Sequence, residues 1–466
     1  MALSRVPVAW YGDDFTGSTD VMEVLAMNGL PSVLFLGIPD HATLERFGNM
    51  RAIGIAGDAR SRPPAWMDEH LAPCFRFLRD LGADLVHYKV CSTFDSSPDK
   101  GSIGRALEIG RTTLDSRLAV PIVVGAPALR RYCTFGNLFA AVGEETFRLD
   151  RHPTMSRHPV TPMAESDLRR HLAVQTPQRV ALFDVLALWA NDYRQRFRRL
   201  LAEEPDAILF DVVDAVSLAR CGELIWEEVR AARFAVASSG LQYALTSYWK
   251  ASGMLDAPDA CASVPAVDRL VVVSGSCSPV TAKQIREAQA SGWKSVAADP
   301  QRLAQPATRS IECDRLEESA LAALESGKSV VVHTACGPDD PRVHRFNDWL
   351  RLSDPMIQGA ANANVGGALG DLLRSLIERV GIERAIVAGG DTSSASGAPL
   401  GIDALTFIAP TSPGSPLCRA HAREGPLDGI SIVFKGGQVG GPGYFEAVRQ
   451  GHFLPSTIDN NARTTP

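Results

Sequence analysis

Short apolar runs rich in β-branched residues alternate along the whole chain with stretches of helical periodicity, and this alternation restricts the possible folds most strongly. Strands that are separated by helices pair in parallel, so the pattern predicts an α/β protein with largely parallel sheets flanked by helices. Helices are expected at Trp66–Leu81 and Asp192–Ala202, among others. The expected strands are Val6–Tyr11, Val33–Leu36, Ala52–Ala56, Leu85–Lys89, Val120–Gly125, Val180–Phe183, Ile208–Val213, Ala235–Ala237, Leu270–Ser274, Ser329–His333, Ala385–Ala388 and Ile430–Lys435.

One stretch interrupts this alternation and divides the chain. Residues 257–268 are small, contain proline and show no periodicity, which is typical of a linker. A chain of 466 residues, of which 45% are hydrophobic, is long enough for two or more cores. We therefore expect two α/β domains, one at 1–256 and one at 269–458, followed by a disordered polar tail at 459–466.

Charge and cysteine content exclude several classes of protein. A net charge of −6, spread without long blocks of one sign, gives no general attraction to nucleic acid or to anionic membranes. No apolar stretch approaches the length of a membrane span, and the N-terminus lacks the apolar core of a signal peptide. Nine cysteines without metal-ligand spacing indicate reduced thiols. These features predict a cytoplasmic protein; its oligomeric state stays open, a homo-oligomer included.

In open α/β sheets, ligands bind beyond the carboxyl ends of the strands, so the loops after strands are the places to search for chemistry. The first such loop, in YGDDFTGSTD, contains the adjacent acids Asp13 and Asp14. One acid could simply cap the following helix. Two acids exceed what capping requires, and either one is a candidate general base.

Two further loops of the first half carry basic and hydroxyl side chains. One follows the third expected strand (GDARSRP, residues 57–63), and the other follows the fourth (HYKVCSTFDSS, residues 87–97). Each residue could also be an ordinary solvated loop residue. Together they suit a small, hydroxyl-rich acid, whose carboxylate an arginine can bind bidentately. The candidate substrate-binding residues are Arg60, Arg62, Lys89, Ser92, Thr93, Asp95 and Ser96.

The loops of the second half are rich in glycine. Backbone N–H groups in such turns, together with helix N-termini, can bind phosphate oxygens, although glycine is also common in plain strand-to-helix turns. Three such loops in one domain favour phosphate binding. Asp391 could contact Mg²⁺ or water or cap its turn, and Lys435 could face phosphate or solvent. The candidate nucleotide-binding residues are Ser276, Ser278, Gly389, Gly390, Asp391, Thr392, Lys435, Gly436, Gly437, Gln438, Val439 and Gly440.

Six motifs, in this order and spacing, resemble the four-carbon acid sugar kinase family, which includes threonate and 3-oxo-tetronate kinases. They are YGDDFTGSTD, the loop Asp58–Arg62, KVCSTFDSS, SGSCSPVTAKQ, AGGDTSSA and KGGQVGG. The resemblance covers nearly the whole chain. It implies ATP- and Mg²⁺-dependent phosphorylation of a sugar-acid hydroxyl, an N-terminal domain that binds the acid and a C-terminal domain that binds the nucleotide. Closure about the linker is then expected to exclude water before transfer.

Two stretches differ from the common pattern of the family. FDSSPDKGS at 94–102 lacks the arginine of the usual Asp-Ser-Thr-Leu-Arg-Gly run, so we expect an altered substrate pocket that could take a branched oxo-acid such as 3-oxo-isoapionate. KGGQVG at 435–440 replaces a Lys-Ser-Gly-Asn-Phe-Gly run, so side-chain contacts to the nucleotide should differ there while backbone contacts persist.

Two alternatives of other classes remain at this point. A nicotinamide-dependent sugar-acid dehydrogenase would need a G-x-G-x-x-G turn with an acid about 20 residues further on, and the chain has none; GDDFTG carries Asp14 where the motif needs glycine. A non-catalytic metabolite-binding protein would keep the binding loops without a base or a metal.

Overall fold

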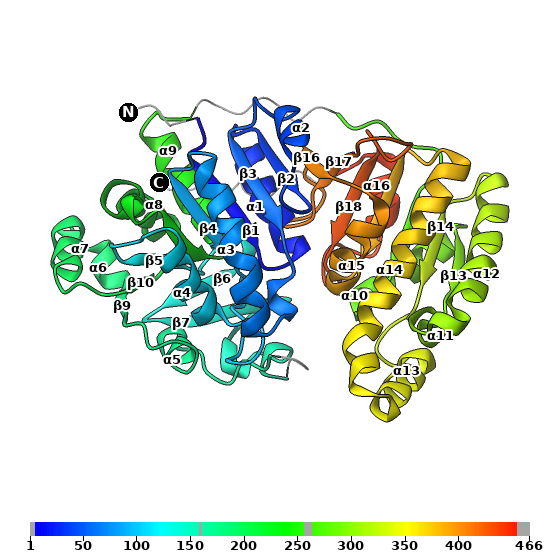
Figure 1. Cartoon of the computed structure of the whole chain (residues 1–466), viewed down its shortest axis with the longest axis horizontal. Coiled ribbons are helices and arrows are strands. Elements are labelled where there is room, and N and C mark those ends of the chain that lie inside the picture. Colours follow the sequence, from blue (N-terminus) through cyan, green and yellow to red (C-terminus); the bar gives the residue numbers. More distant parts are fainter. Residues whose placement is uncertain (1–4, 158–160, 256–262, 454–466) are drawn as a thin grey trace. The chain divides into compact units, whose positions relative to one another are not determined.

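The computed structural model describes residues 5–157, 161–255 and 263–453. They belong to two compact units, Met1–Ile38 with Arg46–Asp259, and Pro39–Glu45 with Ala260–Pro466 (Figure 1). Part of the expected linker and all of the expected disordered tail lie outside the described residues.

The first unit is built on an eight-stranded sheet in which every pairing is parallel. Its strand order is β2-β3-β1-β4-β11-β5-β10-β9, with β1 near the middle. The strands are β1 (Val8–Gly12), β2 (Ser32–Phe35), β3 (Ala52–Ala56), β4 (Leu85–Lys89), β5 (Val120–Val123), β9 (Val180–Phe183), β10 (Ala207–Phe210) and β11 (Phe234–Ala237).

Helices cover both faces of this sheet, because its central strands are apolar on both sides. All residues of β1, β4, β5, β10 and β11 are buried. The helices α3 and α4 pack together, and α9 packs against both α1 and α8. The helices of this unit are α1 (Phe15–Met27), α3 (Pro64–Asp80), α4 (Ile103–Thr113), α5 (Leu168–Ala173), α6 (Val185–Trp189), α7 (Tyr193–Leu201), α8 (Ala215–Leu224) and α9 (Gly240–Ala251), with short helical turns η1 (Ala59–Ser61), η2 (Pro127–Leu129), η3 (Leu149–Arg151), η4 (Met155–Arg157), η5 (Ile225–Val229) and η6 (Arg230–Ala232).

A small antiparallel sheet is inserted between β5 and β9. It consists of β6 (Arg131–Thr134), β7 (Asn137–Val142) and β8 (Glu145–Arg148). An antiparallel bridge between Cys133 and Val212 connects it to the loop after β10. The insertion therefore lies at the carboxyl end of the main sheet, where the polar loops are.

The second unit contains a mixed sheet in the order β13-β14-β12-β15-β18-β17-β16. The first five strands are parallel, and β17 and β16 are antiparallel to their neighbours. The strands are β12 (Val271–Ser274), β13 (Lys294–Ala297), β14 (Val330–His333), β15 (Arg384–Ala388), β16 (Ala404–Ala409), β17 (Leu417–His421) and β18 (Ser431–Lys435).

Helices also pack in two groups in this unit: α14 contacts α11, α12 and α15, whereas α10 contacts α16. The short α2 belongs to this unit although it lies between β2 and β3 in the sequence. Among the described residues, no helix is long and apolar enough to cross a membrane. The helices are α2 (His41–Glu45), α10 (Pro279–Ala290), α11 (Pro300–Ala304), α12 (Pro306–Glu325), α13 (Pro341–Leu352), α14 (Pro355–Val380), α15 (Gly390–Leu400) and α16 (Tyr444–Gln450).

The predicted fold class is confirmed, and each of the twelve expected strands has a counterpart within two residues at either end, apart from β10, which ends three residues early at Phe210. The strands that were not expected are β6–β8, β13, β16 and β17. Most of these are exposed on one face or carry charged residues, so they lack the continuous apolar run that marks a strand buried on both faces.

Candidate active site

The strand order brings three of the predicted loops together, because β1 pairs with β3 on one side and β4 on the other. The Asp13 amide donates to the Lys89 carbonyl at 2.9 Å, and the Arg60 amide donates to the Asp13 carbonyl at 3.0 Å. The loops that follow β1, β3 and β4 thus form one polar site at the carboxyl edge of the first unit.

The two adjacent acids have different surroundings. Asp14 is the N-cap of α1: its Oδ1 accepts from the Gly17 amide at 2.9 Å, and its Oδ2 accepts from Thr16 Oγ1 at 2.9 Å. Asp13 is buried and accepts from Arg60 Nη2 at 2.9 Å and from Arg60 Nε at 3.4 Å. Arg60 Nη2 is also 2.9 Å from Asp14 Oδ1, so one guanidinium joins both carboxylates.

Burial raises the pKa of Asp13 to about 6; the positive charge of Arg60 opposes this shift, and the negative charge of Asp14 adds to it. A carboxylate with this pKa is a stronger base than a solvated aspartate and is still ionised near neutral pH. Capping therefore accounts for Asp14, whereas Asp13 has the properties of a general base.

Lys89 is buried at the end of β4, under the first turn of α1. A Cβ atom on Gly17 would collide with Asp14 Oδ1 and lie 2.6 Å from Lys89 Nζ, so any other residue here would force these side-chain ends to shift. Burial raises the pKa of Asp20 in α1, and the positive charge of Lys89 opposes that shift. Asp20 lies inside a helix, where no sequence signal distinguished it from a surface acid.

The loop after β4 contains the other predicted hydroxyl groups. Thr93 Oγ1 donates to Asp95 Oδ1 at 2.7 Å and lies 2.9 Å from Cys91 Sγ. Ser96 Oγ instead lies 2.9 Å from His171 Nε2 and accepts from Gln175 Nε2 at 2.9 Å. Ser96 thus packs against the segment that contains α5. Thr93 and Asp95 remain beside the charged cluster formed by Asp13, Asp14 and Arg60.

Arg62 is oriented differently from the other predicted substrate-binding residues. Its Nε donates to Asp58 Oδ2 at 2.8 Å, its guanidinium lies over the Trp66 ring at 5.2 Å, and its side chain is 46% exposed. The ion pair of Arg62 is with Asp58, whereas that of Arg60 is with Asp13 and Asp14. The structure therefore groups Arg60 and Lys89 with the acids, but not Arg62.

Three glycine-rich turns meet in the second unit, because β15 pairs with both β12 and β18. The Gly275 amide donates to the Ala388 carbonyl at 3.1 Å, and the Gly389 amide donates to the Lys435 carbonyl at 2.9 Å. Gln284 Nε2, in α10, donates to the carbonyl oxygens of residues 439, 440 and 441 at 2.9–3.1 Å. The turns after β12, β15 and β18 therefore support one another.

Glycine is required at some of these positions because the turns pack closely. A Cβ atom on Gly437 would lie 2.5 Å from Ser276 Oγ, and one on Gly275 would collide with Thr392 Oγ1. Gly389 has a φ of +118°, which side chains disfavour. Gly390 differs: a Cβ atom there would meet no atom within 4 Å. The first turn of α15 therefore faces open space at Gly390.

Lys435 is fully buried beneath these turns, so its side chain does not face solvent. Its Nζ donates to Thr281 Oγ1 at 3.2 Å, and Thr281 Oγ1 donates to the Gly437 carbonyl at 2.8 Å. The ammonium lies 5.9 Å from the centre of the Tyr444 ring, and burial lowers its pKa to about 7. Lys435 thus supports the third turn from below.

The remaining residues of this group have simpler positions. Ser278 caps α10 by accepting from the Val280 amide at 3.1 Å, and its own amide donates to Ser276 Oγ at 3.2 Å. Asp391 is exposed in the first turn of α15. Within the described ranges, no group of three or more His, Cys, Asp or Glu side chains is arranged to hold a metal ion.

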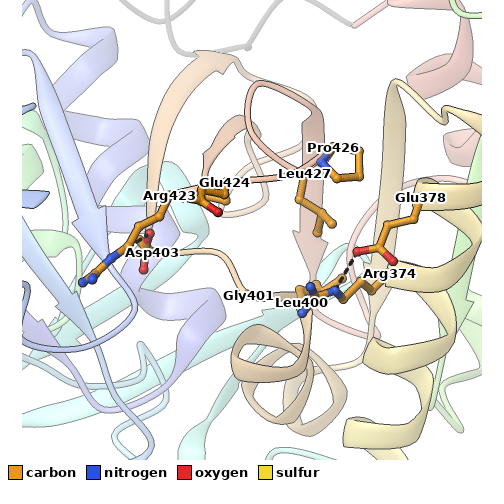
Figure 2. Close-up of a pocket in the computed structure, with 10 residues that line it drawn as sticks. Arg374, Glu378, Leu400, Gly401, Asp403, Arg423, Glu424, Pro426 and Leu427 are labelled. Atoms are coloured by element: carbon orange, nitrogen blue, oxygen red, sulfur yellow. Dashed lines mark hydrogen bonds and ion pairs between the residues drawn. The ribbon is translucent and has the colours of Figure 1, made fainter.

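A cavity of about 370 Å³ in the second unit is separate from these turns (Figure 2). The cavity adjoins Leu400 and Gly401 at the C-terminal end of α15, whereas Gly390 lies at the N-terminal end of this helix. Because the helix has eleven residues, its two ends are about 16 Å apart. Arg374 and Glu378 form an ion pair in its wall. Its position excludes this cavity as the place where the three turns would hold phosphate.

Two family models match the two halves of the chain. A sugar-binding N-terminal domain matches residues 8–245, and a nucleotide-binding C-terminal domain matches residues 271–445. The chain is also 47% identical, over 95% of its own length and 94% of the other, to the 3-oxo-isoapionate kinase of Paraburkholderia graminis. The chain belongs to the four-carbon acid sugar kinase family.

Other relatives agree with this assignment. The 3-oxo-tetronate kinase of Cupriavidus necator is 30% identical over 94% of this chain and 95% of its own. A crystal structure of a Salmonella typhimurium protein, described as a putative tRNA synthase, covers 95% of this chain and 98% of its own, with a TM-score of 0.74 and 25% identity. The two kinases are more similar in sequence to this chain than the Salmonella protein is. That protein shares the fold of this chain, but its description says nothing of this chain's activity.

The protein is therefore an enzyme, a sugar-acid kinase with a nucleotide-binding domain, and the kinases among its relatives imply that it uses ATP. The two alternatives of other classes, a nicotinamide-dependent dehydrogenase and a non-catalytic binding protein, were wrong.

Proposed function

We propose that this kinase transfers the γ-phosphoryl group of ATP to a hydroxyl group of 3-oxo-isoapionate or of a closely related branched oxo-acid. The identity of 47% to a 3-oxo-isoapionate kinase, against 30% to a 3-oxo-tetronate kinase over nearly the same length, carries this proposal. The altered stretch 94–102, which follows β4 and contains Asp95, supports a pocket that differs from that of the threonate and 3-oxo-tetronate kinases.

In the proposed reaction, Asp13 accepts the proton of the attacking hydroxyl. Arg60 holds Asp13 and Asp14 in place, and Lys89 balances part of their negative charge. The substrate hydroxyls are bound by the polar groups of the loop after β4 that are not used in packing, which are Ser92, Thr93 and Asp95. Ser96 supports this loop through its contacts to His171 and Gln175.

We assign nucleotide binding to the second unit, within the domain 269–458, and acid binding to the domain 1–256. The phosphates would contact the N-terminus of α15 and the turns after β12 and β18, where backbone amides are available. Lys435 would supply a positive charge beneath them. The residues assigned to the nucleotide are Ser276, Ser278, Gly389, Gly390, Asp391, Thr392, Lys435, Gly436, Gly437, Gln438, Val439 and Gly440.

Mg²⁺ usually keeps several water ligands and takes only one or two protein carboxylates besides the phosphates. Asp391, exposed in the first turn of α15, fits this limited requirement. Asp391 would hold the ion, which would supply positive charge to neutralise the phosphates. We also propose a cytoplasmic location, since the eight cysteines in the described part of the chain are free thiols.

A panel assay tests the proposed substrate. ADP release should be measured with ATP and, in turn, 3-oxo-isoapionate, 3-oxo-tetronate, threonate and five- and six-carbon sugar acids. We expect the highest kcat/KM with 3-oxo-isoapionate. A higher kcat/KM with 3-oxo-tetronate or threonate would refute the branched substrate while leaving the kinase activity intact.

The pH dependence of turnover follows from the pKa of Asp13, which burial raises to about 6. As a base, Asp13 must be ionised, so kcat/KM for the acid should fall about tenfold per pH unit below pH 6 and level off above it. The measurement is kcat/KM at saturating ATP from pH 5 to 8. A flat profile between pH 5 and 7 would contradict the assignment of Asp13 as the base.

A further inference from the structure

Four basic side chains lie around the polar site of the first unit, and they differ in whether they already form an ion pair with a carboxylate. Arg60 is held by Asp13 and Asp14, and Arg62 by Asp58. Lys89 lies under the first turn of α1, where its positive charge opposes the raised pKa of Asp13 and of Asp20, but it forms no ion pair with a described carboxylate. The fourth cation, Arg131, likewise has no ion pair with any carboxylate of the described residues.

Arg131 begins β6, the first strand of the inserted antiparallel sheet. Its backbone pairs with Ala126: the Ala126 amide donates to the Arg131 carbonyl at 2.9 Å, and the Arg131 amide donates to the Ala126 carbonyl at 3.1 Å. This pairing fixes the start of the side chain directly after β5, at the carboxyl end of the main sheet. Sequence reasoning missed this residue because no motif surrounds it.

One side of the Arg131 guanidinium is occupied by backbone. Nη1 donates to the carbonyl oxygens of Leu129 at 3.1 Å, Arg130 at 3.2 Å and Ala141 at 3.4 Å. The other side has no protein partner: Nε is buried without a hydrogen bond, and the hydrogen bonds of the guanidinium to described residues all come from Nη1. The Nε and Nη2 donors form the edge with which arginine binds a carboxylate bidentately.

Burial of Nε without a partner is unfavourable, because this N–H donor loses its water and gains no other hydrogen bond. Burial also lowers the pKa of Arg131, and Cys91 lies near it. Cys91 belongs to the loop after β4: its Sγ is 2.9 Å from Thr93 Oγ1, which donates to Asp95 Oδ1 at 2.7 Å. Arg131 therefore lies near the loop after β4, which is part of the polar site.

We propose that Arg131 binds the carboxylate of the sugar acid through Nε and Nη2, and that it thereby selects acids over neutral sugars. This inference rests on the proposed function, which supplies an acid as the substrate. The reacting hydroxyl must approach Asp13, and the negative charges of Asp13 and Asp14 repel a second carboxylate. The substrate therefore orients with its carboxylate at Arg131 and its reacting hydroxyl at Asp13.

The test uses two substitutions with a matched control. Arg131→Lys keeps the charge but loses the bidentate fork, and Arg131→Met removes both while keeping a long side chain. Arg130→Met is the control, because Arg130 is exposed and its guanidinium donates, among the described residues, to the backbone carbonyls of residues 143 and 144. KM for the acid, KM for ATP, kcat and Tm are measured for each protein, and the acid is compared with its carboxylate-free polyol.

We expect KM for the acid to rise roughly 10- to 100-fold in Arg131→Met and less in Arg131→Lys. KM for ATP and kcat/KM for the polyol should stay unchanged, so the preference for the acid should largely disappear. An acid KM within twofold of wild type, or an equal rise for acid and polyol together with a lower Tm, would overturn the proposal and leave Arg131 a structural residue.

Failure of the proposed function can be told apart from failure of this inference. If the wild-type protein phosphorylates no acid of the panel, calorimetric titration of threonate into wild type, Arg131→Lys and Arg130→Met tests carboxylate binding directly. Should Arg131→Met fail to fold, the comparison of Arg131→Lys with Arg130→Met decides alone. Equal threonate affinity in these two proteins would refute the role of Arg131.

Discussion

Asp13→Asn is expected to reduce kcat by roughly 10²–10⁴-fold, the usual contribution of a general base. Asparagine keeps the shape of the side chain and can still accept a hydrogen bond from Arg60, but it cannot take a proton. Burial disfavours the ionised form of Asp13, as its raised pKa shows, so a neutral residue should not lower Tm. The measurement is kcat at saturating acid and ATP, together with Tm.

The matched control for this substitution is Asp80→Asn. Asp80 is exposed and, within the described part of the chain, pairs with its neighbour Arg79 alone; exposed ion pairs contribute little to stability. We expect wild-type turnover in this control. Folded Asp13→Asn protein with near wild-type kcat would show that Asp13 is not the base, and the same substitution at Asp14 would then be the next experiment.

The second large effect is expected for Gly390→Ala. Alanine suits a helix better than glycine does, and its Cβ atom would meet no protein atom within 4 Å. The fold should therefore keep or gain stability. If ATP phosphate approaches the first turn of α15, the added methyl group will push it away from the backbone amides, and the loss of one such charged hydrogen bond should weaken binding roughly 10- to 100-fold.

Calorimetric titration with a non-hydrolysable ATP analogue measures this effect. Gly359→Ala is the control, because Gly359 is also helical, in α14, and a Cβ atom there also meets nothing within 4 Å. Gly437 is a poorer probe, since its Cβ atom would lie 2.5 Å from Ser276 Oγ and disturb the packing of the turns. Unchanged affinity in Gly390→Ala would exclude phosphate from this helix terminus.

The sequence alone determined the fold class, nearly all strands of the parallel parts of the sheets, and the loops in which we expect the chemistry. These features are readable because a strand buried on both faces needs a continuous apolar run, and because the carboxyl ends of parallel strands share one edge. The six ordered motifs also pointed to the family through their order and spacing along the chain. The composition of each short segment and the order of the motifs along the chain carry this information.

Only the tertiary structure decided which partner each charged side chain takes. Asp13 and Arg60 are 47 positions apart and meet because β1 pairs with β3. Arg62, one of the candidate substrate-binding residues, forms an ion pair with Asp58. Lys435 is buried beneath the glycine turns, and the unpartnered Nε of Arg131 lies on a strand with no motif. The burial of these side chains and the pairing of Asp13 with Arg60 depend on residues distant in sequence, so no local pattern reveals them.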